Sequence, residues 1–316
     1  MQLRNLGKSG LRVSTVGLGC NNFGGRLDLE ASRRVVHKAL DLGITFLDTA
    51  DIYGDSGGSE TILGEVLGDR RKEIVLATKF GMVMSEEHQL KGASRRYIMS
   101  AVENSLRRLK TEWIDLYQLH TPDPLTPIEE TLRALDDLVR QGKVRYIGCS
   151  NLPAWQVVEA QWTSRTLGLE AFVSCQDEYS LIVRDIEREL VPAAQAYGLG
   201  VIPYFPLARG LLTGEYKYNH DAPLPEGTRL ANTQRLASRY MTERNWRKVE
   251  RLNAFCEARN RSLLELAFSW LLARPQVASV IAGATRPEQV EQNIAAAGWE
   301  LSQDDLAEID RVLSEA

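Results

Sequence analysis

Eight short runs rich in β-branched and apolar residues alternate along this chain with amphipathic stretches of helical period. Parallel strands joined by helices give this alternation, and eight strand–helix units make up a (β/α)8 TIM barrel. A doubly wound sheet is the alternative, but no Gly-x-Gly-x-x-Gly motif opens a helix after one of the runs. We therefore predict an α/β barrel formed as one domain over residues 1–316. The predicted strands are 14–20, 45–50, 73–80, 114–120, 144–151, 171–177, 200–206 and 277–284.

Both ends of the chain and one long connection fall outside the repeat. Residues 2–4 and 12–15 flank two glycines and are predicted to form an N-terminal β-hairpin. Ser302 is suited to cap a C-terminal helix over 302–316. Residues 220–238 show no periodicity, and a loop of that length usually has a function. The other helices predicted from periodicity and flanking residues include 28–42, 94–109 and 127–140.

Charge, hydropathy and cysteine usage argue against several classes of function. The formal net charge of −4 gives no basic footprint for a nucleic acid. No run approaches the roughly 18–20 apolar residues of a membrane helix, and residues 1–10 lack the apolar core of a signal peptide. The spacing of the four cysteines fits neither a metal site nor a disulfide framework, so we expect them to be reduced. We expect a cytoplasmic protein with a small-molecule substrate, no nucleic-acid or membrane partner, and polar outer helix faces that specify no oligomer.

Titratable side chains stand at the ends of three consecutive predicted strands, where a barrel carries its chemistry. Asp48 ends the second strand, and Tyr53 lies on the loop after it. Lys79 ends the third strand and His120 the fourth. Each alone has an ordinary structural explanation, such as a solvated lysine, a packed tyrosine or a helix-capping aspartate. Four such groups converging on one end of a barrel favour a catalytic site.

These four side chains suit proton transfer to a carbonyl group. A tyrosine with a pKa of about 10 is a weak acid at neutral pH unless a cation stabilises its phenolate. Lys79 can supply that charge to Tyr53, and Asp48 can keep Lys79 charged and oriented. His120 can hydrogen-bond the substrate oxygen, so the predicted chemistry is general acid catalysis. No metal is required, because the four histidines have no ligand spacing.

Eight motifs spread over the chain are individually weak and together specific. They are GLGCNNFGG (17–25), LDTADIYG (47–54), GGSETILGEVL (57–67), ATKF (77–80), DLYQLH (115–120), IGCSN (147–151), YFPLARGLLTGEY (204–216) and GATRPEQVEQN (283–293). On these motifs the chain resembles the aldo-keto reductase superfamily, in particular the branch with bacterial sugar-aldehyde reductases and potassium-channel β-subunits. The resemblance implies a barrel that binds NADPH in an extended form, without a Rossmann domain, and reduces aldehydes or ketones to alcohols.

The same resemblance implies roles for individual positions. The catalytic tetrad would be Asp48, Tyr53, Lys79 and His120, with Tyr53 as proton donor. The nicotinamide would contact Ser150, Asn151, Gln176 and the ring of Tyr204. The rest of the cofactor would lie along Cys20, Asn21, Asp48, Pro206, Leu207, Gly210 and Arg229. The adenosine 2′-phosphate would meet Gly283, Thr285 and Arg286, and the adenine Gln289, Gln292 and Asn293.

Two arginines are candidates for contacts to anionic groups of the cofactor or the substrate. Arg286 begins a predicted helix beside Pro287, where the helix N-terminus favours an anion, and its planar fork suits a phosphate monoester. This favours NADPH over NADH. Arg209 has two interpretations, a contact to a substrate carboxylate or phosphate, and a structural salt bridge. The substrate-pocket candidates by position are Asn22, Phe23, Phe80, Met82 and Arg209, besides Tyr53 and His120.

Two other functions would use the same residues. One is a cofactor-sensing regulatory binding protein, as the channel β-subunits are. Those relatives carry asparagine at the position of His120, so the histidine favours an enzyme here. The other is an NAD(P)+-dependent sugar or alcohol dehydrogenase, because one site serves both reaction directions.

Overall fold

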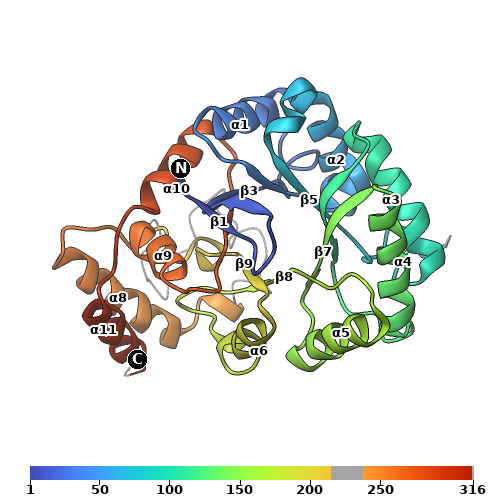
Figure 1. The fold of residues 1–316 in the computed structure, drawn as a ribbon. Helices are drawn as coiled ribbons and strands as arrows, with labels where there is room; N and C mark the ends of the chain where they lie inside the picture. The colour runs from blue at the N-terminus through green and yellow to red at the C-terminus, as the bar shows by residue number, and fades with distance from the viewer. Residues whose placement is uncertain (88, 215–237, 315–316) are drawn as a thin grey trace.

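The computed structural model describes residues 1–87, 89–214 and 238–314, and over these it shows the predicted barrel (Figure 1). Eight parallel strands form one sheet in the order β10-β3-β4-β5-β6-β7-β8-β9. The sheet is nearly closed, because the Val201 amide donates to the Gln276 carbonyl oxygen at 2.7 Å and the Ala278 amide to the Val201 carbonyl oxygen at 3.0 Å. The strands are β3 (Val16–Gly19), β4 (Phe46–Asp48), β5 (Val75–Phe80), β6 (Ile114–Leu119), β7 (Val144–Ser150), β8 (Ser174–Glu178), β9 (Gly200–Tyr204) and β10 (Val280–Gly283).

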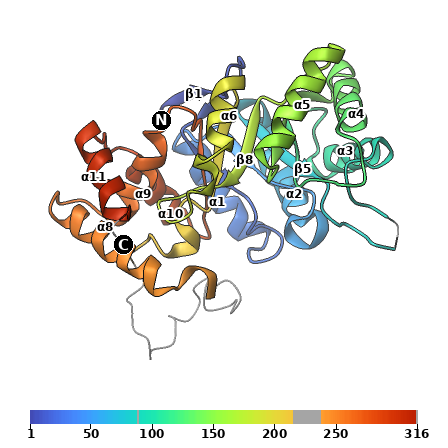
Figure 2. The same ribbon diagram turned by 90° about the horizontal axis from the view of Figure 1, so that it is seen from below.

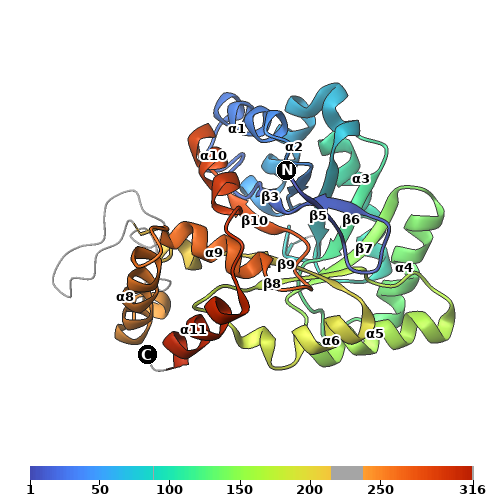
Figure 3. The same cartoon turned by 60° about the vertical axis from the view of Figure 1, so that its left-hand side comes forward.

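Helices surround these strands, as the 3.6-residue periodicity predicts (Figure 1). Asp28 caps α1 by accepting from the Ala31 amide at 2.8 Å, and Ser94 caps α3 by accepting from the Tyr97 amide at 3.3 Å. The C-terminal helices α8 and α11 pack against each other at one edge of the barrel (Figure 3). Within the described residues, none of the helices combines the length and apolarity needed to cross a membrane. The helices are α1 (Leu29–Asp41), α2 (Tyr53–Leu67), α3 (Arg95–Leu109), α4 (Ile128–Arg140), α5 (Ala154–Leu167), α6 (Leu190–Tyr197), α8 (Glu243–Glu257), α9 (Leu263–Leu272), α10 (Pro287–Ala296) and α11 (Gln303–Ser314).

The N-terminal hairpin closes one end of the barrel. Strand β1 (Leu3–Asn5) pairs antiparallel with β2 (Arg12–Ser14), which confirms the prediction. Leu6 and Val13 are fully buried against the apolar residues of the barrel interior. The Lys8 amide donates to the carbonyl oxygen of Gly198, just before β9, at 2.8 Å. The hairpin therefore lies at the N-terminal ends of the strands (Figure 2).

Side-chain alternation along the strands places a polar layer above an apolar one inside the barrel. Successive residues of a strand point to opposite faces, so inward side chains recur at every second position. The inward apolar residues in the first half of the central strands are Phe46, Ala77 and Leu116. Two positions further along, the same face carries Asp48, Lys79 and Gln118, all buried. Polar groups therefore gather inside the barrel toward its C-terminal end.

The outer face of α5 departs from the polar surface that the sequence predicts. Trp155 and Trp162 are seven residues apart, so they share one face of the helix. The two residues are 63% and 52% exposed. Trp162 Nε1 donates to the Tyr197 hydroxyl on α6 at 2.7 Å. The expectation of polar outer helix faces is therefore wrong at α5.

Candidate active site

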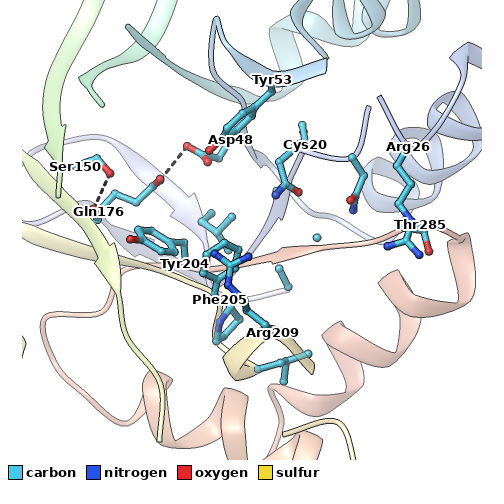
Figure 4. Close-up of a pocket in the computed structure, with 18 of the residues that line it drawn as sticks. Cys20, Arg26, Asp48, Tyr53, Ser150, Gln176, Tyr204, Phe205, Arg209 and Thr285 are labelled. Atoms are coloured by element: carbon cyan, nitrogen blue, oxygen red, sulfur yellow. Dashed lines mark hydrogen bonds between the residues drawn. The ribbon is translucent and has the colours of Figure 1, made fainter. Parts of the chain in front are cut away.

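A cavity of about 730 Å³ lies at the C-terminal ends of the strands, within the size range of small-molecule sites. We call the corner lined by Asp48, Tyr53 and His120, with Lys79 buried beneath it, the tyrosine end. We call the corner with Arg26, Thr285 and Arg286 the arginine end. Figure 4 labels Asp48 and Tyr53 at the first corner and Arg26 and Thr285 at the second. The predicted residues in the cavity wall are Cys20, Asn21, Asn22, Asp48, Tyr53, Met82, His120, Ser150, Asn151, Gln176, Tyr204, Pro206, Leu207, Arg209, Gly210, Gly283, Thr285, Arg286 and Gln289.

A buried ion pair lies beneath the tyrosine end. Lys79 Nζ donates to Asp48 Oδ2 at 2.6 Å and to the Thr49 carbonyl oxygen at 2.8 Å. Asp48 Oδ1 accepts from Gln118 Nε2 at 3.2 Å and from Gln176 Nε2 at 2.9 Å. Burial lowers the pKa of Lys79, but Asp48 and then Tyr53 more than offset that effect, so the pKa is raised. The ammonium therefore stays charged although its side chain is fully buried.

Tyr53 stands beside both Lys79 and His120. The Lys79 ammonium lies 5.1 Å from the centroid of the Tyr53 ring. The His120 ring meets the Tyr53 ring edge-on, with centroids 5.7 Å apart. Burial raises the pKa of Tyr53, and Lys79 opposes that rise. The sequence predicted the direction of the lysine's effect but not that burial outweighs it, so Tyr53 is protonated at neutral pH.

His120 is neutral at physiological pH. Burial, and then the charge of Lys79, lower its pKa to about 3. Its Nδ1 is buried and has no hydrogen-bond partner among the described residues. Orphaned buried N–H groups are rarer than orphaned acceptors, so we place the ring proton on Nε2. His120 lines the cavity and therefore presents one neutral N–H donor there.

Amide and hydroxyl groups beside His120 are bonded to one another. Asn151 Nδ2 donates to the His120 carbonyl oxygen at 2.9 Å and to Ser150 Oγ at 3.0 Å. The Tyr204 hydroxyl donates to Asn151 Oδ1 at 2.7 Å. Ser150 Oγ donates to the Gln176 carbonyl oxygen at 2.8 Å (Figure 4). Both N–H groups of Asn151 are used, so the capacity it retains toward the cavity is that of an acceptor.

The arginine end is suited to an anion. Arg286 directly precedes α10, whose first residue is Pro287, and a helix N-terminus favours negative charge. The Arg26 side chain lies beside Thr285 (Figure 4). At Gly283 a Cβ would lie 3.3 Å from Asn22 Nδ2, so glycine keeps this wall open. Among the described residues of the wall, Asp48 is the single carboxylate, and Lys79 neutralises it.

Several predicted residues lie outside the cavity wall. Phe23 and Phe80 are fully buried and absent from it, so their placement in the substrate pocket is wrong. Ala77 faces the barrel interior, and alternation turns Phe80 outward, where its ring centroid lies 4.7 Å from that of Tyr117. Phe23 packs in the same outer apolar layer. The other predicted residues outside the wall are Lys79, Gln292 and Asn293, and Arg229 falls outside the described residues.

Residues without a sequence prediction also reach the cavity. Gln118 lies behind the wall, where it bonds Asp48, and strand periodicity would have identified it because it stands two positions before His120 in the motif YQLH. Arg26 gives no such signal, because a turn brings it to the cavity. Gly24 in that turn has φ 77°, and a Cβ there would lie 2.6 Å from the backbone of Gly58. The additional wall residues are Gly19, Arg26, Thr121, Phe205, Ile281 and Ala282.

The sequence profile of the Aldo/keto reductase family matches residues 15–314. A probable voltage-gated potassium channel subunit beta of Arabidopsis thaliana is 37% identical over 303 residues, covering 94% of this chain and 91% of the plant protein. The uncharacterized oxidoreductase YrpG of Bacillus subtilis is 37% identical over 306 residues, covering 94% and 91% of the two chains. An L-glyceraldehyde 3-phosphate reductase of Escherichia coli O157:H7 is 35% identical over 327 residues, covering 100% and 93%.

These matches extend over nearly the whole chain, as the eight motifs do. They confirm the resemblance, and the family supports carbonyl reduction as the general type of reaction. Members of the family generally use nicotinamide cofactors. This chain belongs to the aldo/keto reductase family.

Proposed function

We propose that this protein reduces aldehydes or ketones to alcohols, with hydride from NADPH and a proton from Tyr53. The tyrosine end carries the proposal, because a protonated phenol, a neutral histidine and a paired ammonium meet at one corner of the cavity. This combination supplies a donor for the developing alkoxide and a fixed charge to stabilise the donor after it has lost its proton. Such general acid catalysis contributes about 10²–10⁴-fold to a rate.

Each residue of the tyrosine end has a catalytic role that follows from its charge state. Tyr53 donates its proton to the carbonyl oxygen. Lys79 stabilises the resulting phenolate, as its opposition to the raised pKa of Tyr53 indicates. Asp48 holds Lys79 through the 2.6 Å contact, which fixes the ammonium in place. His120 donates from Nε2 to the same carbonyl oxygen and so selects the orientation of the substrate.

The rest of the wall fits a nicotinamide dinucleotide. When bound, such a cofactor supplies hydride to the carbonyl carbon. Ser150, Asn151 and Gln176 would hold its carboxamide, whose N–H groups match the acceptor left on Asn151. Tyr204 would provide a ring face for stacking. These groups and the cavity volume support the assignment.

The charge of the arginine end favours NADPH over NADH. Arg286 and Arg26 bring two guanidinium groups to one corner, and both residues are exposed. A phosphate monoester accepts bidentate hydrogen bonds from a guanidinium, whereas a ribose hydroxyl gains less from such a group. We infer that this corner receives the adenosine 2′-phosphate.

Two related functions remain candidates. The Arabidopsis relative is named as a probable channel subunit, which favours cofactor-dependent regulation as a second function. The reverse reaction, oxidation of an alcohol with NADP+, would use the same residues. The relative named L-glyceraldehyde 3-phosphate reductase makes short hydroxyaldehydes and their phosphates the first substrates to test.

The test compares wild type with Tyr53→Phe for NADPH oxidation over aldehydes, ketones and sugars, alongside NADPH binding by fluorescence. We expect turnover to collapse in Tyr53→Phe while NADPH still binds. Tyr117→Phe is the matched control, because that hydroxyl is buried without a partner among the described residues. Tight NADPH binding by the wild type without turnover of any carbonyl would contradict the reductase and favour regulation or oxidation.

A further inference from the structure

Arg209 contributes a guanidinium to the cavity wall near Tyr204 and Phe205 (Figure 4). Its Nε is buried and has no hydrogen-bond partner within the described ranges. The sequence left open a structural salt bridge, and Glu178 is the carboxylate that attracts Arg209. Glu178 is instead bonded to Arg239, at 3.1 Å, and to the hydroxyl of Tyr240. Among the described residues, Arg209 forms no ion pair, and Glu178 acts on it through its charge without a direct contact.

The backbone and one ring fix the position of Arg209. Its Cζ lies 3.8 Å from the centroid of the Phe205 ring, a cation–π contact that orients the guanidinium. Phe205, Ala208 and Arg209 have φ of 52°, 45° and 59°, in the left-handed region that non-glycine residues adopt only at a cost. Such backbone conformations persist only where the surrounding structure holds them in place, and they are frequent in functional loops.

Glu178 attracts Arg209 from outside the described cavity wall, so toward the cavity the guanidinium faces no carboxylate of its own. Burial lowers the pKa of Arg209, because the charged form has lost part of its hydration. In the described part of the cavity wall, Asp48 is the one carboxylate, and Lys79 already binds it. An anionic ligand group would therefore replace the lost hydration. A guanidinium offers a planar fork that matches phosphate oxygens.

We propose that Arg209 is an anion-binding residue of this cavity and receives a phosphate group of the bound ligand. The proposal rests on the proposed function, which gives the phosphate two sources, the carbonyl substrate and the cofactor pyrophosphate. Arg209 contacts the ring of Phe205, which packs edge-on against Tyr204. The Tyr204 hydroxyl bonds Asn151, and Asn151 in turn bonds the His120 carbonyl oxygen. This places Arg209 on the side of the tyrosine end, so a phosphate on the substrate is the source we expect.

The experiment uses Arg209→Gln, which removes the charge, and Arg209→Lys, which keeps a point charge but loses the fork. Arg165→Gln is the matched control, because Arg165 is exposed on α5 and the net charge changes equally. Three quantities are measured for each protein. They are the NADPH Kd by fluorescence, kcat/KM for glyceraldehyde and for glyceraldehyde 3-phosphate, and binding of glyceraldehyde 3-phosphate to the NADP+ complex by calorimetry.

In Arg209→Gln we expect kcat/KM for glyceraldehyde 3-phosphate to fall about 10- to 100-fold, the size of a charge-assisted hydrogen bond. In the same variant, kcat/KM for glyceraldehyde and the Kd for NADPH should change less than about twofold. In Arg209→Lys, kcat/KM for glyceraldehyde 3-phosphate should lie between the values of wild type and Arg209→Gln. A matching rise in the NADPH Kd, with both aldehydes affected alike, would instead assign the phosphate to the cofactor. Unchanged NADPH, substrate and calorimetric affinities would overturn the proposal.

Failure of the proposed function gives a different result. A wild-type protein that reduces neither these aldehydes nor any other carbonyl compound of the panel contradicts carbonyl reduction, but the NADPH Kd and the calorimetric affinity still report on Arg209. If the wild type binds neither NADPH nor glyceraldehyde 3-phosphate more tightly than Arg209→Gln, then Arg209 binds no ligand phosphate.

Discussion

The two ends of the cavity hold their charges in different ways. At the tyrosine end, Asp48 and Lys79 lie on strands inside the barrel, with side chains no more than 5% exposed. At the arginine end, Arg26 and Arg286 lie on exposed turns at the cavity wall. A buried charge must be paired within the protein, because its desolvation is costly. The exposed guanidinium of Arg286 needs no partner inside the protein and can meet a ligand, which agrees with the chemistry proposed for the first end and the recognition proposed for the second.

Removal of the buried cation should give the largest effect. In Lys79→Met, Asp48 loses its ionic partner inside the barrel, and we expect the free energy of unfolding to fall by about 3–5 kcal/mol. Turnover should be abolished as well. Urea unfolding and a carbonyl reduction assay measure the two effects.

The double variant Asp48→Asn/Lys79→Met separates stability from catalysis. It removes both charges, so most of the lost stability should return while turnover stays absent. If Lys79→Met were as stable as wild type, the idea that the tyrosine end depends on internal charge pairing would fail.

At the arginine end, a substitution should weaken ligand binding and leave the stability of the protein unchanged. Arg286→Gln should weaken NADPH binding about 10- to 100-fold, because one charge-assisted contact to the phosphate is lost. The NADH Kd and the unfolding free energy should stay nearly constant, because Arg286 is exposed and absent from the core. Arg133→Gln, on the outer face of α4, controls for net charge. An equal loss for NADPH and NADH would show that Arg286 does not recognise the 2′-phosphate.

Strand residues and turn residues differ in how well the sequence predicts them. Inward positions on strands follow a period of two, so Asp48, Lys79 and Gln118 can be placed inside the barrel from spacing alone. The same period places Phe80 outside the barrel, whereas its position in a motif suggested the pocket. A motif shows that a residue is near the site, but the strand period determines which face it occupies.

Turns carry no comparable rule. Arg26 and Phe205 reach the cavity through backbone conformations that residue spacing does not encode. Phe205 has φ of 52°, although an aromatic residue gives no reason to expect the left-handed region. Asp55 and Ser56 also lie in the left-handed region, with φ of 57° and 64°. They separate Tyr53 from the regular part of α2. The predicted loop above Asp48 is thus an irregular turn at the start of a helix.

A buried carboxyl behind the tyrosine end should make stability depend on pH. Asp51 accepts from the Tyr97 hydroxyl at 3.2 Å, and burial followed by Glu60 raises its pKa to about 7, although Tyr97 and Arg108 oppose this. The unfolded carboxyl ionises near pH 4, so between about pH 4 and 7 the unfolded state releases a proton that the folded state retains. Stability should therefore fall as pH rises, by at most about 1.4 kcal/mol per pH unit.

Asp51→Asn removes this titration while keeping a side chain of similar shape. The variant should gain stability relative to wild type from pH 5 to pH 7 and show no further relative change above about pH 8. Urea unfolding at each pH measures the difference. A difference that does not vary with pH would mean that Asp51 titrates alike in both states.

The smallest effect should come from the hydrogen bond between Tyr204 and Asn151, beside the tyrosine end. Tyr204→Phe keeps the ring but removes the 2.7 Å hydrogen bond to Asn151 Oδ1, so Asn151 loses one of its restraints. We expect KM for NADPH to rise about 2- to 10-fold, the usual size of one neutral hydrogen bond, with kcat nearly unchanged. Tyr117→Phe should change neither constant, because no described residue bonds that hydroxyl. A fall in kcat larger than the rise in KM would instead place the Tyr204 hydroxyl in the chemical step, through Asn151 and the His120 backbone that it bonds.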